Sequence, residues 1–373
     1  MVLAVTGIVL PDREERTLFI DGGVLREEPV PGADRLTDGG WLLPGLVDVH
    51  THPGAEQPGD PFEDTVLRRD LAGQAAAGVL LVRAPGSAAR IPAWAHDGDG
   101  LPRVRSAGPW LATPGRFFPD WGRRITEAEL AAAALGEATA SAAAQRAAGL
   151  AAAPGTGAPG AAASGGWCKI IGDWAQDEPP VPLDALRAAV SVVHDAGGQV
   201  AVHCQTAQGC ANAVAAGADS LEHGMHLAPA LLDQMAAQGT ALVPTIGAFA
   251  QGAVRVRAQS PSPRRDAFLR GWAALPGIAR AAYEAGVTVL AGTDTHPCGT
   301  VAQEVERLIS AGLPRDAALG AACWTARSWL GLPGLADGAP ADLVVFAEDP
   351  VAHPDVLHHP SRIVLRGQVV SSG

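Results

Sequence analysis

The sequence almost lacks lysine. Of its 27 basic residues, only Lys169 is a lysine and the other 26 are arginines, although lysine is normally among the commonest residues. Lys169 stands in the apolar run "WCKIIG", which is typical of a buried strand. A buried lysine can lose its proton, whereas a guanidinium effectively cannot. Either Lys169 is a chance survivor whose head group reaches solvent, or its position needs an amine that arginine cannot replace.

Cysteines and long apolar runs are scarce as well. The five cysteines are an odd and scattered set, which argues against a disulfide framework and favours a reducing compartment. The first apolar run is broken by Gly7 and Pro11 and has no basic region before it, so we expect a strand rather than a signal peptide. No run is long and apolar enough to span a bilayer. We therefore expect a cytoplasmic protein.

Positive charge is also in deficit. The 27 basic residues against 39 acidic ones leave a net charge of −12, which argues against nucleic acid and anionic membrane surfaces as partners. We expect a small-molecule substrate as the partner, and the sequence leaves open whether the chain forms a homo-oligomer.

Short apolar runs alternate with Ala- and Leu-rich helical patterns through the middle of the chain. Eight such runs are "GLVDVH", "GVLLVRA", "RVRSAG", "WCKIIG", "GQVAVH", "DSLEH", "TALVPTI" and "VTVLAG". They span roughly 250 residues, the usual size of a (β/α)₈ TIM barrel. A doubly wound open sheet would give the same alternation, so the α/β class is predicted first and the barrel within it.

The two ends of the chain share a different pattern. Residues 1–42 and 336–373 hold short β-rich runs split by turn residues. We predict a small β-sandwich domain assembled from both termini, around a barrel domain of residues 43–335. Residues 151–166 are rich in Gly, Ala and Pro and predict a flexible loop. Because that loop precedes a strand, we expect it on the barrel face away from the catalytic end.

Polar residues end several of the predicted strands. His50 and His52 close the first strand in "DVHTHP", and residues two apart on a strand point to the same side. Further strands end in His203 ("VAVHC"), His223 ("SLEHG") and Asp294 ("LAGTDTHP"). A single histidine there is usually structural, but polar residues gathered at the carboxyl ends of barrel strands indicate catalysis. Because imidazole is a common metal ligand, the set predicts a metal site.

A metal site gives the lone lysine a role. Two divalent ions held close together need an anionic bridge as well as imidazoles. A neutral lysine amine reacts with carbon dioxide to give a carbamate, a two-oxygen anion, and an arginine does not do so at neutral pH. We therefore predict that Lys169 becomes a metal ligand once it is carboxylated.

These motifs occur in a specific order along the chain. They read "LPGLVDVHTHPG", "WCKIIG", "VAVHC", "AAGADSLEHGMHL", "VTVLAGTDTHP" and "GLADGAPADLVVFAEDP". In this order the chain resembles the amidohydrolase superfamily of metal-dependent hydrolases, and within it the imidazolonepropionase-like and prolidase-like branch. The resemblance covers nearly the whole chain, including the β domain formed from both termini.

The resemblance implies two divalent metal ions and a hydrolytic reaction. By position, it assigns the first ion to His50, His52 and Asp294, the second to His203 and His223, and the bridge between them to carboxylated Lys169 and a hydroxide. Zinc is the expected metal, with manganese, iron and cobalt as alternatives. The hydroxide would attack a substrate carbonyl, while Asp294 would act as general base and then as the acid for the leaving amine.

The implied function is hydrolysis of an amide bond in a small molecule such as a dipeptide, an acyl amino acid or a lactam. Hydrolysis of a lactone or a phosphoester at the same site is one alternative. A lyase that uses Lys169 as a Schiff-base nucleophile is another, and a metal-binding scaffold without catalysis is a third. The bridging lysine argues against imidazolonepropionase activity itself, since that enzyme's pattern has one metal and no such lysine.

The chain departs from the family pattern where the substrate should bind. The third-strand region reads "AGPWLATPGRFFPDWG", where many relatives carry a glycine–glycine–histidine lid, and His203 is followed by "CQT". These departures leave the substrate open. The candidate substrate contacts are five residues near the predicted strand ends: Phe117, Trp121, His226, Arg255 and His296. For each of them a structural or solvated role is the alternative.

Overall fold

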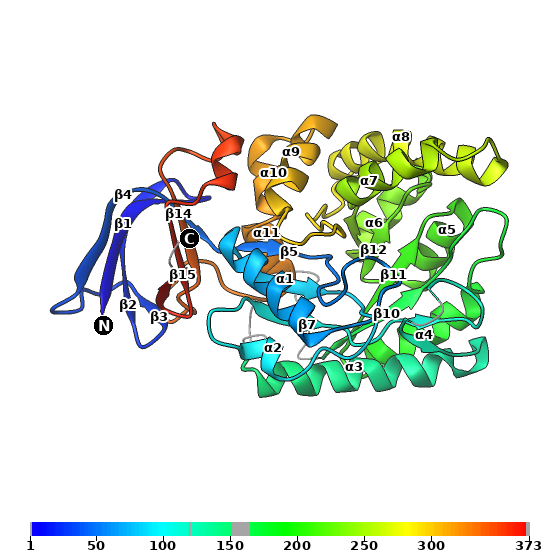
Figure 1. Ribbon diagram of the computed structural model, residues 1–373, viewed down its shortest axis with the longest axis horizontal. Coiled ribbons are helices and arrows are strands. Elements are labelled where there is room, and N and C mark those ends of the chain that lie inside the picture. The colour runs from blue at the N-terminus through cyan, green and yellow to red at the C-terminus, as the bar shows by residue number, and fades with distance from the viewer. Residues whose placement is uncertain (1, 119–120, 151–164, 371–373) are drawn as a thin grey trace.

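The computed structural model describes residues 2–118, 121–150 and 165–370. A β-sheet that carries both chain ends lies at one end of the molecule, and a larger body of helices and parallel strands forms the rest (Figure 1). Residues 151–164 of the predicted loop lie outside the described residues. The last residue of that loop, Gly166, is packed: its carbonyl accepts a hydrogen bond from the Gln199 amide, and a Cβ there would lie 2.1 Å from the Ala138 carbonyl oxygen.

The terminal sheet has seven strands, in the order β16-β15-β14-β4-β1-β2-β3. They are β1 (Leu3–Val9), β2 (Glu14–Asp21), β3 (Val24–Arg26), β4 (Asp34–Pro44), β14 (Leu343–Phe346), β15 (Arg362–Leu365) and β16 (Gln368–Val370). β4 pairs antiparallel with β14, which joins the two ends of the chain. Along β1 every second residue is buried, as expected of a strand with one face on a core. The sandwich form and the domain boundaries stay predictions.

The remaining strands form two parallel sheets. One contains β5 (Leu46–Asp48), β6 (Val79–Ala84) and β7 (Arg103–Ser106). The other contains β8 (Leu111–Ala112), β9 (Arg123–Arg124), β10 (Trp167–Ile171), β11 (Gln199–Cys204), β12 (Ser220–His223) and β13 (Ala241–Val243). β6, β10, β11 and β12 are buried at every position. Parallel strands covered on both faces are apolar in this way, which explains the continuous apolar runs in the sequence.

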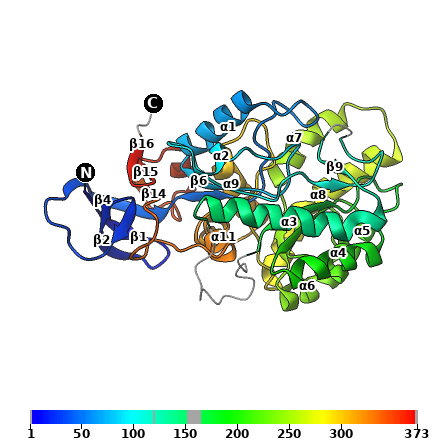
Figure 2. The same ribbon diagram turned by 90° about the horizontal axis from the view of Figure 1, so that it is seen from below.

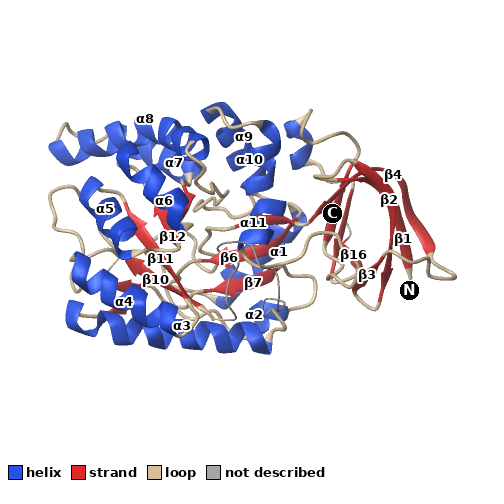
Figure 3. Cartoon of the chain, turned by 180° about the vertical axis from the view of Figure 1, so that it is seen from behind, coloured by secondary structure: helices blue, strands red, loops and turns tan. Residues whose placement is uncertain are grey.

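Helices surround these strands (Figures 2 and 3). They are α1 (Asp64–Ala76), α2 (Trp94–Asp97), α3 (Leu130–Ala147), α4 (Leu183–Asp195), α5 (Ala207–Ala216), α6 (Leu232–Gln238), α7 (Ile246–Arg257), α8 (Pro263–Glu284), α9 (Val301–Ala311), α10 (Arg315–Ala321) and α11 (Trp324–Trp329). Single 3₁₀ turns cover Glu127–Glu129, Pro229–Leu231 and Pro354–His358. Within the described ranges, no helix has the length and apolarity that crossing a membrane requires. The five cysteines all fall in those ranges and are free thiols.

Local sequence explains where helices begin and end. The Thr206 hydroxyl accepts a hydrogen bond from the Gly209 amide and caps α5, and Gly217 ends that helix in the left-handed conformation. Ser262 caps α8 in the same manner and is followed by Pro263 at the first helical position. Such caps satisfy amides that have no partner within the helix. They keep the connections after β11 and before α8 short and defined.

The two parallel sheets are linked by backbone contacts. The Val49 amide donates to the Ala291 carbonyl at 3.1 Å, and the Leu290 amide donates to the Leu242 carbonyl at 2.9 Å. The predicted eighth strand forms only an isolated bridge, at Val289. The result is a mixed α/β fold with parallel sheets whose carboxyl ends meet at one edge. A fully closed eight-stranded barrel stays a prediction.

Candidate metal centre and substrate pocket

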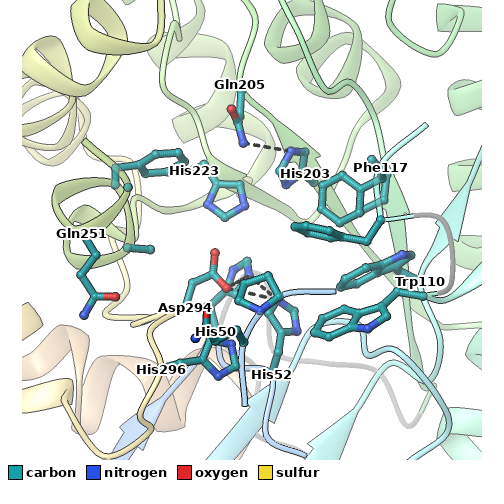
Figure 4. A pocket seen from close by; sticks show the side chains of 18 of the residues that line it. His50, His52, Trp110, Phe117, His203, Gln205, His223, Gln251, Asp294 and His296 are labelled. Atoms are coloured by element: carbon teal, nitrogen blue, oxygen red, sulfur yellow. Dashed lines mark hydrogen bonds and ion pairs between the residues drawn. The ribbon is translucent and has the colours of Figure 1, made fainter. Parts of the chain in front are cut away.

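Four histidines and an aspartate lie around one point near the carboxyl ends of the parallel strands (Figure 4), and the lone lysine lines the same pocket. His50 and His52 follow β5, and their Nε2 atoms are 3.1 Å apart. Asp294 follows the bridge at Val289, and its Oδ1 lies 3.4 Å from His52 Nε2 and 4.0 Å from His50 Nε2. These three residues come from the first and last of the predicted barrel strands.

His203 and His223 face the same point from the neighbouring strands β11 and β12. Their ring centroids are 4.6 Å apart, and the His223 ring is 5.0 Å from that of His50. One ligand atom each of His50, His223 and Asp294 lies within 4.8 Å of the other two. The four imidazoles and Asp294, far apart in sequence, are therefore brought together.

Lys169 stands in the middle of β10 and is buried. Its Nζ has no hydrogen-bond partner among the residues that the structure describes. The side chain passes closely over Gly86, where a Cβ would lie 2.8 Å from Lys169 Cγ. Burial lowers the pKa of Lys169 to about 8, with Arg83 acting in the same direction and Glu222 and Asp294 opposing it. Burial therefore favours the neutral amine of Lys169 more than solvent would.

The backbone is strained at two of these positions. His223 has φ 73° and Asp294 has φ 49°, a region that costs a residue other than glycine about 1–3 kcal/mol. Gly292 precedes Asp294 by two residues, and a Cβ there would lie 2.4 Å from His50 Cβ. The Asp294 amide donates to the His50 carbonyl at 2.7 Å. The last strand thus approaches His50 at backbone distance and turns sharply to present its carboxylate.

Hydrogen bonds orient three of the imidazoles. His52 Nδ1 donates to the Gly86 carbonyl at 2.6 Å, and His50 Nδ1 donates to the Glu222 carboxylate at 2.6 Å. His223 Nδ1 lies 2.7 Å from the Thr245 hydroxyl. In a neutral imidazole whose Nδ1 carries the proton, Nε2 presents a lone pair. The lone pairs of His50 and His52 consequently face each other at 3.1 Å, an arrangement that fits a divalent cation between them.

The titration of the site agrees with a cation-binding role. Burial, reinforced by the charge of Lys169, lowers the pKa of His50 to about 4. Burial lowers the pKa values of the other three imidazoles well below their ordinary range. Neutral imidazoles are the form that binds metals. Asp294 differs: burial, with Asp48 and Glu222 nearby, raises its pKa to about 7 against the opposing effect of Lys169.

A buried charged pair supports His50 from inside the strands, and sequence reasoning missed it. Arg83 on β6 and Glu222 on β12 are 1% and 0% exposed, and their nearest charged atoms are 3.1 Å apart. Ser220 donates to Glu222 at 2.6 Å and accepts from Arg83 at 2.9 Å. The Arg83 guanidinium stacks 4.1 Å from the Trp167 ring. Although burial raises it, Arg83, Lys169 and His50 together hold the pKa of Glu222 well below its usual range.

Asp48 is a second buried carboxylate that sequence reasoning missed. It accepts hydrogen bonds from the Thr293 amide at 3.0 Å, the Thr293 hydroxyl at 2.6 Å, the His50 amide at 3.2 Å and Gln74 at 3.2 Å. Burial raises the pKa of Asp48 to about 6. It ties the segment before Asp294 to the segment before His50. The signal available in the sequence was a charged residue inside each apolar run, "GLVDVH" and "SLEH".

A pocket of about 720 Å³ opens above these residues. Four of the five candidate substrate contacts line it: Phe117, Trp121, Arg255 and His296. The fifth, His226, lines a neighbouring pocket of about 330 Å³ instead. Figure 4 shows Gln251 on the side of the pocket opposite Phe117 and Trp110, with Asp294 pointing into the space between. The α7 side of the pocket also carries Phe249, whose ring is 5.8 Å from that of Phe268, so both sides hold aromatic rings and the α7 side adds the polar Gln251 and Arg255.

The sequence matches the profile of the amidohydrolase family over residues 175–370. It is 36% identical to an uncharacterized protein of Mycobacterium tuberculosis, over 98% of this chain and 95% of that one. Its fold is similar to that of an Xaa-Pro dipeptidase with bound methionine, at a TM-score of 0.77 and 22% identity over 99% of this chain and 100% of that one. It is also similar to a putative prolidase from Bifidobacterium longum, at a TM-score of 0.76 and 22% identity over 99% and 94%.

The profile match covers more than half of the chain, and the mycobacterial relative aligns with nearly all of it. His203, His223 and Asp294 lie within the residues that match the family profile, and His50, His52 and Lys169 precede them. The chain belongs to the amidohydrolase family and is a hydrolase acting on carbon–nitrogen bonds.

Proposed function

We propose that this enzyme hydrolyses the amide bond of a small molecule, such as a dipeptide, an acyl amino acid or a lactam, at a centre of two divalent metal ions. The observation that carries the proposal is the convergence of four neutral imidazoles and Asp294 on one point beside the buried, unpartnered Nζ of Lys169. Among the described residues, that Nζ has no hydrogen-bond partner. Fold similarity to an Xaa-Pro dipeptidase, an enzyme of peptides, supports the choice of an amide.

These residues would hold two ions. His50, His52 and Asp294 would hold one ion, and His203 and His223 the other. Lys169 would bridge them as a carbamate, formed when its neutral amine nitrogen bonds to the carbon of carbon dioxide and releases a proton. Burial of Lys169 favours that neutral amine. Zinc suits this mixture of nitrogen and oxygen ligands.

When bound, the ions supply Lewis acidity, which lowers the pKa of a water molecule from 15.7 toward about 7 and polarises the substrate carbonyl. Asp294 is the group that moves the proton. Its carboxylate oxygen takes the proton from the attacking water and then delivers it to the amide nitrogen as the carbon–nitrogen bond breaks. Its carboxylate oxygen lies 3.4 Å from His52 Nε2, so it is close enough to the proposed ligands to exchange that proton at the reacting centre. The products are a carboxylic acid and an amine.

Polar residues of α7 suit a carboxylate on the amine half of the substrate. Arg255 lies on α7 one turn after Gln251, and both line the pocket. Arg69, also in the lining, is paired with Glu56 and Asp70, whereas Arg255 has no ion pair with any described residue. Arginine binds carboxylates in a two-pronged geometry. We assign to Arg255 the contact with a free carboxylate, as in a dipeptide or an acyl amino acid.

We also propose that the parallel strands form one closed barrel and that both chain ends form a separate small domain. The contacts between Val49 and Ala291 and between Leu242 and Leu290 support one closed barrel built from the two parallel sheets. The pairing of β4 with β14 supports a small β domain of both chain ends. The five free cysteines, four of them buried, are compatible with a cytoplasmic location.

Metal content and activity test this proposal together. Protein purified with bicarbonate is expected to hold about two ions per chain, and Lys169→Ala and Lys169→Arg about one or none. Lys169→Arg is the matched control for charge, because it keeps the cation and removes carbamate formation. The wild type is then assayed on amides, lactones and phosphoesters. A metal-free wild type that zinc does not reconstitute, or a carbonyl substrate trapped on Lys169 by borohydride, would overturn the proposal.

A further inference from the structure

One side of the pocket is a cluster of five rings, called here the aromatic wall: Trp110, Phe117, Phe118, Trp121 and Trp174. Phe117 is at its centre. Its ring centroid lies 4.6 Å from that of Trp174, 4.8 Å from Trp110 and 4.9 Å from Phe118, in edge-to-face contacts. Edge-to-face packing is a favourable arrangement for aromatic rings. All five residues line the pocket.

The wall has a buried layer and an open layer. Trp110 and Trp121 are 2% and 3% exposed and belong to a small apolar cluster with Ile171. Trp121 therefore supports the wall from behind more than it offers surface to a substrate. Phe117, Phe118 and Trp174 are only partly buried and face the pocket. Phe117 and Phe118 pack against the buried cluster and also line the pocket, so part of their ring surface faces the pocket.

Two rings of the aromatic wall lie next to candidate metal ligands. The Phe117 ring is 5.0 Å from that of His203, and the Trp110 ring is 5.5 Å from that of His52. Phe117 has φ 61°, a conformation that costs a phenylalanine about 1–3 kcal/mol and that the surroundings must impose. Strain of this kind clusters at binding sites. A group lying on the wall would be directly beside the reacting carbonyl.

The position of Asp294 decides which half of the substrate meets the wall. In Figure 4, Asp294 points into the pocket between the wall and Gln251. The proton that Asp294 delivers goes to the amide nitrogen, so the amine half lies toward Asp294 and the polar residues beyond it. The acyl half extends in the opposite direction from the carbonyl carbon. That direction leads to Phe117 and its neighbours.

We propose that the aromatic wall binds an aromatic acyl group, so that the substrates are amides of aryl-bearing carboxylic acids. This inference rests on the proposed amide hydrolysis and narrows its substrate class. Short or charged acyl groups leave the rings of the open layer uncovered. A flat ring excludes water from Phe117, Phe118 and Trp174 together.

The test compares amides that differ only in the acyl group. N-acetyl, N-cyclohexanecarbonyl and N-benzoyl derivatives of one amino acid are assayed with the zinc-loaded enzyme. We expect kcat/KM for the benzoyl compound to exceed that for the acetyl compound by about 10- to 100-fold, the range for added apolar contacts in a pocket. The cyclohexyl compound, equal in size but not aromatic, is expected between the two. Equal values for all three would overturn the inference without any variant.

Variants locate the preference on the wall. Phe118→Ala and the milder Phe118→Leu are expected to reduce the ratio of benzoyl to acetyl kcat/KM by about 10-fold. Phe19→Ala is the matched control, since Phe19 is a half-buried aromatic of the terminal sheet and lies outside the pocket lining. An unchanged ratio in both Phe118 variants, or the same loss in Phe19→Ala, would refute the assignment.

Binding without catalysis separates this inference from the proposed function. Benzoate and acetate, the two product acids, are titrated into the protein by calorimetry. Tighter binding of benzoate, weakened in Phe118→Ala, supports the wall even where no amide is cleaved, in which case only the amide hydrolysis fails. Cleavage of amides with no preference for the aryl group, together with equal binding of benzoate and acetate, overturns the wall and leaves the amide hydrolysis standing.

Discussion

Replacing Glu222 by alanine tests whether the buried charge network holds His50 in place. Glu222 joins two groups that have lost contact with water: its Oε2 accepts from His50 Nδ1 at 2.6 Å, and its Oε1 accepts from Arg83 at 3.1 Å. Alanine removes both acceptors. Arg83 keeps the Val49 carbonyl at 3.1 Å and Ser220 at 2.9 Å, but it loses its counter-charge.

The expected loss of stability follows from these two consequences. Breaking a buried ion pair by deleting one partner costs about 3–5 kcal/mol. A buried donor left without an acceptor, here His50 Nδ1–H, costs about 1–3 kcal/mol. The two losses share one missing carboxylate and are not additive. We therefore expect Glu222→Ala to lower the free energy of unfolding of the metal-free protein by about 3–5 kcal/mol.

The same change should weaken metal binding. Without Glu222 the His50 ring loses the acceptor that fixes its tautomer and orientation, and such losses typically cost 10–100-fold in metal affinity. Urea denaturation of chelator-treated protein measures the stability, and competition with a zinc-binding dye measures the affinity. A loss of stability that leaves the His50 ring in place would not change the zinc affinity, so the affinity measurement reports on the orientation of that ring.

Two matched variants sharpen the result. Glu284→Ala removes an exposed carboxylate that is 2.8 Å from Arg280 and 57% exposed, so it should cost only about 0.3–0.5 kcal/mol. The double variant Arg83→Met/Glu222→Gln removes both buried charges and keeps an acceptor for His50, so it should be more stable than Glu222→Ala. A loss below about 1 kcal/mol in Glu222→Ala with zinc affinity unchanged within about twofold would refute the network's role.

Three further changes have defined outcomes. Gly292→Ala places a Cβ 2.4 Å from His50 Cβ and should cost about 1–3 kcal/mol by urea denaturation, with fewer zinc ions retained. Burial raises the pKa of Glu304 from its ordinary 4.5 to about 7, against the opposing amides of Gly247 and Ile246. The folded state then holds this proton more tightly, so Glu304 should contribute a loss of about 3 kcal/mol of stability between pH 4.5 and 7, read as the difference between the wild type and Glu304→Gln over that range. Chelation should lower the Tm and zinc should restore it, because a ligand of the folded state alone stabilises that state; a Tm unaffected by both would contradict a resident metal.

The family and most of the candidate metal ligands could be predicted from the sequence because both depend on local patterns. Continuous apolar runs in the sequence, such as those of β10 and β11, indicate strands of a parallel sheet, and both strands are buried at every position. The polar residue that ends each run then had to lie at one edge, because parallel strands share the direction of their carboxyl ends. His50, His203 and His223 were placed by that rule alone.

Other features needed the register of strands that are distant in sequence. Glu222 pairs in register with His203, so the two side chains lie on one face, whereas alternation places the adjacent His223 on the other. The positive φ of His223 returns its ring to the site. The residues around His223 contain no pattern that predicts this left-handed conformation.

What the sequence by itself determined is the parallel α/β arrangement, the family and the ligand-bearing strand ends. Only the tertiary structure decided that Arg83 meets a carboxylate 139 residues away and that the Phe117 ring, from a loop, stands beside His203. Strand identity and side-chain alternation are encoded by neighbouring residues. The partner of a buried charge, and the path of a loop, depend instead on how distant segments pack, which no short stretch of sequence contains.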